Sequence, residues 1–199
     1  STFFIWKIYS FFARLKKINY FFNNKRKQFL KNGYADLGNI NKDDEERIKE
    51  IINPHLNNAE GPLISLPRKE YDQLAYYINK FIEEFNDEIA LILGSEFQSS
   101  FIQVQKTIPS NIDDKDSSFA WHFDDEPLQM IKVFLYLTDT TKNNGAFRTF
   151  NRKISKKLFL RKFISNTSYD RIRSQNLVTK DIEKESIWIE RRSGSLFCF

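Results

Sequence analysis

Residues 121–147 read WHFDDEPLQMIKVFLYLTDTTKNNGAF, and this stretch decides the expected fold. Over residues 130–138 the side chains alternate strictly, which is typical of a β-strand with two different faces. One face is aliphatic and consists of Ile131, Val133, Leu135 and Leu137. The other consists of Met130, Lys132, Phe134, Tyr136 and Thr138. A lysine in line with aromatic residues indicates a strand that lines a barrel lumen or a cleft.

Strand patterns continue on both sides of this stretch. The Asn-Asn-Gly sequence of residues 143–145 predicts a turn, after which residues 146–150 return as a strand. Residues 101–108 also alternate between apolar and polar side chains. Residues 187–199 predict a last hairpin, in which two short strands flank a Ser-Gly turn.

Two helices are predicted upstream of these strands. Asn41 and the acidic residues after it indicate a helix start, and Pro54 is expected to end that helix. A longer helix is predicted from near Pro67 to Gly94, because its apolar residues recur at close to the helical period. Helices therefore precede strands, which favours an α+β domain with a β-sandwich or barrel core.

The composition is that of a packed globule in a reducing compartment. The chain has 199 residues, of which 41% are hydrophobic and 16% aromatic, enough for one domain with a sizeable core. Its single cysteine, Cys198, excludes an internal disulfide and a zinc site built on paired cysteines. We therefore expect a cytoplasmic protein, with the alternative of a peripheral membrane location.

Positive charge is concentrated in two blocks. Residues 1–35 carry eight cations and no acid, so the rest of the chain has a net charge of −3, the difference between +5 and +8. The second block, residues 152–162, carries six cations and no acid. Such blocks indicate either an anionic partner or a solvated face. Nucleic acid is the least favoured partner, because charge alone supports it.

Residues 1–22 are aromatic and basic, with apolar residues at amphipathic-helix spacing. Lys7 and Arg14 interrupt the apolar run, so this segment is too polar to span a membrane. It either covers the body of its own protein or lies in a membrane interface.

His122 and Asp124 are the candidate metal ligands. On an extended backbone, residues two apart point the same way, so an imidazole and a carboxylate can converge on one point. With a second histidine they would form the two-histidine, one-carboxylate triad that holds iron(II) and leaves positions open for co-substrate and dioxygen. The competing interpretation is a surface histidine paired with an acid in a loop.

The same stretch resembles the phytanoyl-CoA dioxygenase family. The shared elements are the His-x-Asp of His122 and Asp124, an apolar strand ending in Leu-Thr-Asp at Asp139, and the Asn-Gly turn at Gly145 followed by Ala-Phe. The resemblance implies a double-stranded β-helix core, of jelly-roll or cupin-like type, with N-terminal helices packed outside. It divides the chain into a basic aromatic helix over residues 1–30 and one dioxygenase-like domain over residues 31–199.

The resemblance also implies an activity. Iron(II) and 2-oxoglutarate would be used with dioxygen to hydroxylate a small-molecule or lipid-like substrate. Relatives that halogenate lack the carboxylate that Asp124 supplies here, so its presence favours hydroxylation. The family's third ligand, a histidine, and its arginine for the co-substrate lie beyond a strand that residues 192–199 resemble. His55, near the end of a helix, is expected to be a surface or capping residue and not that ligand. We expect the complete protein to continue past Phe199, because residues 196–199 would otherwise end on an unfinished apolar strand.

Lys132 and Gln105 are the remaining candidates, for 2-oxoglutarate or substrate. Lys132 would pair with a carboxylate or instead protect a strand edge. Gln105 would donate a hydrogen bond to the co-substrate. Phe134 and Tyr136 either line the pocket or fill the core. The rival to the enzyme is a catalytically incomplete member of the fold that binds an anionic partner through its basic surfaces.

Overall fold

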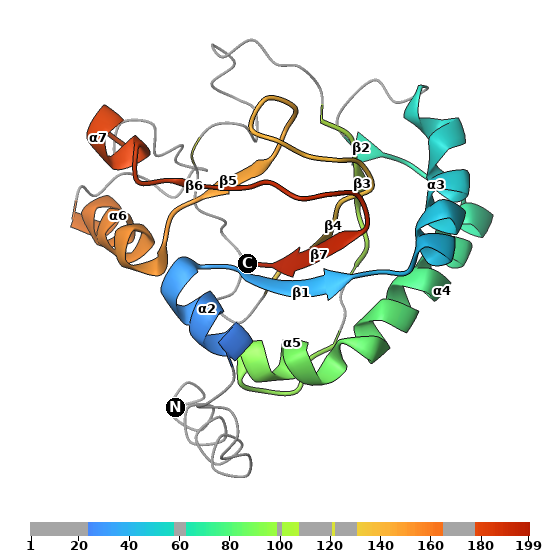
Figure 1. Cartoon of the computed structure of the whole chain (residues 1–199), viewed down its shortest axis with the longest axis horizontal. Helices are drawn as coiled ribbons and strands as arrows, with labels where there is room; N and C mark the ends of the chain where they lie inside the picture. The colour runs from blue at the N-terminus through green and yellow to red at the C-terminus, as the bar shows by residue number, and fades with distance from the viewer. Residues whose placement is uncertain (1–23, 58–62, 99–100, 108–120, 122–130, 165–177) are drawn as a thin grey trace.

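The computed structural model describes residues 24–57, 63–98, 101–107, 121, 131–164 and 178–199 (Figure 1). These residues form a mixed structure of helices and small antiparallel sheets. The helices are α2 (Asn24–Asn32), α3 (Lys42–Leu56), α4 (Arg68–Glu84), α5 (Asn86–Leu93), α6 (Arg152–Ile164) and α7 (Lys180–Glu183). The strands are β1 (Ala35–Asn39), β2 (Leu63–Ile64), β3 (Val104–Gln105), β4 (Val133–Leu135), β5 (Phe147–Thr149), β6 (Ile187–Ile189) and β7 (Ser195–Cys198).

Strand β7 is the centre of the three-stranded sheet β1-β7-β4, and all its residues are buried. Both neighbours run antiparallel to it, with Phe197 opposite Asp36 on β1 and opposite Phe134 on β4. The pairing extends one residue beyond β4, because Lys132 and Phe199 exchange backbone hydrogen bonds of 2.9 and 3.1 Å.

The predicted last hairpin is wrong in its pairing. The chain does turn at Ser193 and Gly194, but β6 pairs with β5, whereas β7 pairs with β1 and β4. The physical reason is that a strand has only two edges, and β1 and β4 already occupy both edges of β7. The resulting pairs are nested, with β5-β6 inside β4-β7, and a bridge between Thr140 and Arg191 joins the two pairs.

The predicted start of α3 is confirmed, and its predicted end is two residues early. The Asn41 side chain caps the helix by accepting a 2.8 Å hydrogen bond from the Asp44 backbone N–H. Pro54 lies inside the helix, which continues to Leu56. A proline in the last turn removes only one backbone hydrogen bond, so the helix tolerates it there.

The predicted helix from Pro67 to Gly94 is two helices. It breaks at Phe85, whose φ of −99° and ψ of 13° leave the helical range. The Phe85 ring contacts Gly38 on β1, where a side chain would lie 3.3 Å from the ring. Gly94 ends α5 in the left-handed conformation, with its N–H 2.8 Å from the Ala90 carbonyl oxygen.

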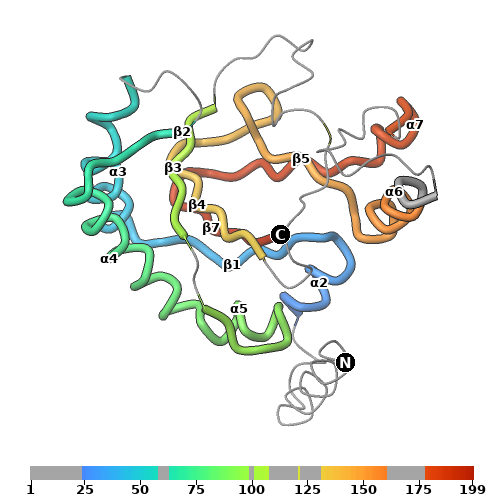
Figure 2. Tube along the Cα trace, turned by 180° about the vertical axis from the view of Figure 1, so that it is seen from behind, coloured from blue at the N-terminus to red at the C-terminus, as the bar shows by residue number. Residues whose placement is uncertain are grey.

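The two faces predicted for the strand around β4 are confirmed except at Val133, which is 40% exposed and does not join the core. Ile131, Leu135 and Leu137 pack on an aliphatic core that also contains Leu37, Leu196 and Cys198 and is closed by α3, α4 and α5. Phe134 and Tyr136 lie on the opposite face, in ring contact with Phe197. Figure 2, seen from behind, shows α3, α4 and α5 to the left of and below these strands, α2, α6 and α7 to the right, and β5 above them.

Candidate functional site

His122 and Asp124 lie outside the described residues, and so do residues 1–22. The structure does place the residue before the motif, Trp121. Its ring stacks on Phe150 at a centroid distance of 4.3 Å and an interplanar angle of 26°. The chain that enters the His-x-Asp motif is therefore attached to the residue that follows β5.

Arg148, on β5, also contacts the Trp121 ring. The guanidinium carbon of Arg148 lies 4.9 Å from the Trp121 ring centre and 4.6 Å from that of Trp188, its cross-strand partner on β6. The guanidinium also donates to the Ser186 hydroxyl at 2.7 Å and to the Glu183 carboxylate at 2.8 Å. Arg148 thus connects Trp121, β6 and the end of α7.

Aromatic rings cover the face of the sheet that lies opposite the aliphatic core. Phe134 stacks on Phe197 at 5.3 Å and lies 5.1 Å from Phe199, while Phe147 lies 4.1 Å from Phe199. Phe197 is fully buried. These rings come from β4, β5 and the end of the chain, so the cluster bridges the two nested strand pairs.

Tyr136 has a structural role in this cluster. Its hydroxyl accepts a 2.8 Å hydrogen bond from the Phe147 N–H and donates to the Ile189 carbonyl oxygen at 3.4 Å. Burial raises the pKa of this phenol above its usual value, although the hydrogen bond from Phe147 opposes the shift. A phenol held this way stays neutral near pH 7 and ties the strands together.

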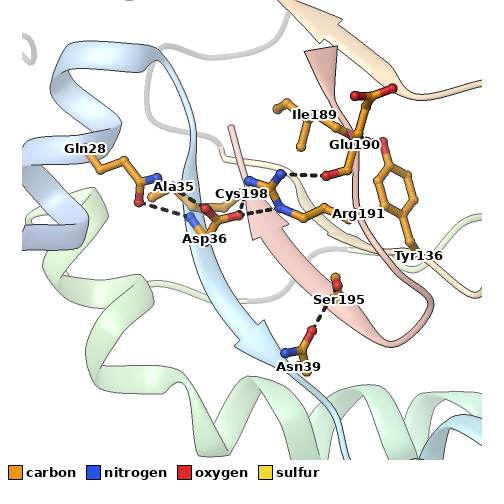
Figure 3. A network of polar contacts seen from close by, with 10 residues as sticks. All are labelled: Gln28, Ala35, Asp36, Asn39, Tyr136, Ile189, Glu190, Arg191, Ser195 and Cys198. Atoms are coloured by element: carbon orange, nitrogen blue, oxygen red, sulfur yellow. Dashed lines mark hydrogen bonds and ion pairs between the residues drawn. The ribbon is translucent and has the colours of Figure 1, made fainter. Parts of the chain in front are cut away.

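An ion pair that the sequence did not indicate joins the two ends of the described chain. Arg191 donates two hydrogen bonds to Asp36 Oδ1, at 2.9 and 2.6 Å, and a third to the Glu190 carbonyl oxygen (Figure 3). Gln28 on α2 holds the same carboxylate at 3.2 Å. Asp36 and Arg191 are 155 residues apart, so no pattern of neighbouring residues predicts this ion pair.

Lys132 and Gln105 belong to different sheets. Lys132 is half-buried, pairs with Phe199 and lies on the Phe134 face by strand alternation. Gln105 lies exposed on β3, which pairs with β2, and donates to the Gln103 side chain at 3.4 Å. The structure therefore keeps Lys132 next to the aromatic cluster and leaves Gln105 at the surface.

Clustered metal ligands can be sought only among the described residues, which leave out His122 and Asp124. Among the described residues, no group of three or more histidine, cysteine, aspartate or glutamate side chains is placed to hold a metal ion. His55 lies on the helical layer, in an open groove of about 760 Å³ between α3 and α4 that Glu50, Pro54 and Tyr77 also line.

No protein-family model, curated protein or solved structure matches this chain.

Proposed function

We propose that the protein is an iron(II)- and 2-oxoglutarate-dependent dioxygenase of the phytanoyl-CoA dioxygenase type, hydroxylating a small-molecule or lipid-like substrate. The observation that carries the proposal is the nested antiparallel pairing downstream of the His-x-Asp motif, with β4 on β7 and β5 on β6. A double-stranded β-helix is a long hairpin whose two arms wrap around one interior, so its strands pair in this nested order. The His-x-Asp motif comes before β4, which belongs to the outer pair, β4–β7.

The position of Trp121 supports the same proposal. Its packing on Phe150 and Arg148 puts the start of the motif beside the strand pair β5–β6. His122 and Asp124 would then hold the metal, which when bound activates dioxygen with 2-oxoglutarate. The aromatic face of β4 and β7 would form an apolar wall that excludes water. Lys132 on that face would attract a carboxylate of the co-substrate or substrate.

The test compares neighbouring carboxylates in the full-length protein. Iron(II) binding is measured by equilibrium dialysis, and turnover is measured as iron-dependent formation of succinate from 2-oxoglutarate. Asp124→Ala should abolish both. The matched control is Asp125→Ala, because on an extended backbone residue 125 points away from the side of residues 122 and 124.

Two results would contradict the enzyme. Unchanged turnover in Asp124→Ala would remove this carboxylate from the ligand set. A wild-type protein that binds neither iron(II) nor 2-oxoglutarate would favour the catalytically incomplete binding protein instead. A substrate screen is worthwhile only after succinate formation has been established.

A further inference from the structure

Two basic helices far apart in sequence lie side by side at one end of the molecule. They are α2 and α6, next to each other in Figure 1 and again from behind in Figure 2, while α3 and α4 lie at the opposite end. Their sequences, NKRKQFLKN and RKISKKLFLRKFI, contain ten lysines and arginines and no acid. The described part of the first basic block and helix α6, which carries the second block, are thereby joined into one region.

Helix α6 divides its residues between a buried stripe and a solvent face. Ile154 and Leu158, one turn apart, pack on Phe150 and Ile182. The exposed residues combine charge with apolar surface: Arg152, Lys153, Lys156, Lys157, Phe159 and Leu160. Phe159 is 45% exposed and Leu160 54% exposed. At helical spacing they extend the rows of cations, so apolar and basic side chains share one face.

Helix α2 adds the same mixture beside it. Lys27, Leu30 and Lys31 are exposed and lie at i, i+3 and i+4, on one face of the helix. The other two cations face the protein: Lys25 donates to the Leu37 carbonyl oxygen at 2.7 Å, and Arg26 donates to the last carbonyls of α5. The helix is therefore held to the body by one side and presents the other.

The described acids beside the two helices are paired with other cations, Glu88 with Lys25 at 3.5 Å and Asp36 with Arg191 at 2.6 Å. On α7, Glu183 is engaged by Arg148 at 2.8 Å, and Asp181 by Lys184 at 3.0 Å. Arg152, Lys153, Lys156 and Lys157 make no ion pair with any residue that the structure describes. This part of the surface keeps its positive potential.

We infer that the α2–α6 face, defined as Lys27, Leu30, Lys31 and the six exposed α6 residues, docks on an anionic phospholipid membrane. Cations attract the lipid phosphates and carboxylates, and exposed leucine and phenylalanine side chains enter the boundary between headgroups and acyl chains. A nucleic acid would use the cations but not the aliphatic Leu30 and Leu160. No helix in the described part of the chain is long and apolar enough to cross a bilayer.

The experiment measures co-sedimentation of the whole chain with vesicles of phosphatidylcholine, with and without phosphatidylserine. Each cation near an anionic bilayer strengthens binding about five-fold, so Lys156→Gln with Lys157→Gln should weaken binding about 30-fold. Leu160→Gln should weaken it about ten-fold without any change of charge. The matched control, Lys42→Gln with Lys69→Gln, removes two exposed cations from the first turns of α3 and α4 and should bind like wild type.

The outcomes decide between charge in general and this surface. Selective loss in the α6 variants, with unchanged thermal unfolding, supports the proposal. Equal binding by the α6 double variant and its control would overturn it. A second pattern would also overturn it, namely unchanged vesicle binding in both α6 variants combined with altered binding to a single-stranded oligonucleotide. If the double variant loses oligonucleotide binding and Leu160→Gln keeps it, the face is a nucleic-acid surface.

Discussion

Replacing Arg148 by methionine should destabilise the fold and release Trp121. Methionine keeps the length of the side chain but removes its charge and its hydrogen bonds. The arginine lies between Trp121 and Trp188, and its guanidinium is bonded to Ser186 and Glu183. Every one of these contacts joins segments that are separate in sequence, so their loss affects the assembled fold.

The expected magnitude follows from the contacts. Two cation–π contacts at partly exposed sites contribute about 0.5–1 kcal/mol each. The hydrogen bond to Ser186 adds about 1 kcal/mol. The ion pair with Glu183 has side chains 26% and 41% exposed, so solvent limits its contribution to less than about 1 kcal/mol. After allowing for the packing that methionine retains, the free energy of unfolding should fall by about 2 kcal/mol.

The assay is urea unfolding followed by tryptophan emission and, independently, by circular dichroism. Arg148→Lys should lose about half as much, because an ammonium keeps the charge but not the planar fork. Arg152→Met serves as control, because that arginine is exposed at the start of α6. If Arg148→Met costs no more than the control, or leaves the emission spectrum of the folded protein unchanged, the proposed role of Arg148 is wrong.

Two further predictions concern titratable groups. Burial raises the pKa of the Cys198 thiol to about 12, so this thiol should resist thiol reagents at pH 8 until the protein unfolds. The free energy of unfolding should fall as the pH rises from 9.0 towards 12, because the thiol ionises first in the unfolded chain. Equal labelling of folded and unfolded chains would contradict this. The hydrogen bond from Lys80 lowers the pKa of Asp44 below 3.8, so this carboxylate contributes stability above pH 3.8 that is lost as the pH falls through its lowered value. Asp44→Asn should therefore flatten the acid limb of the unfolding curve, and an unchanged limb would refute that assignment.

Local signals in the sequence predicted the elements that depend on neighbouring residues. Asn41 starts α3 and Gly94 ends α5, because capping needs only groups within a few residues. The alternation around β4 predicted two faces, because side-chain direction in a strand is a local property. The candidate ligands His122 and Asp124 likewise come from a pattern of neighbouring residues.

Strand β1 is an element that such local signals did not predict. Its sequence, ADLGN, is rich in residues that disfavour strands, and it still forms one edge of the central sheet. The unpaired edge of β7 provides its hydrogen bonds, and Arg191 provides a partner for Asp36. The break at Phe85 has the same kind of cause, since its ring fits against Gly38 of this strand.

By itself the sequence determined where α3 begins and α5 ends, most of the two faces around β4 and which residues are candidate iron ligands. Only the tertiary structure decided that β6 pairs with β5, that Arg148 lies between two tryptophans and that α2 and α6 form one basic face. The physical reason is the distance along the sequence over which each kind of interaction acts. Capping and periodicity act over a few residues, whereas strand partners and shared surfaces depend on which distant segments complement each other once the core has formed.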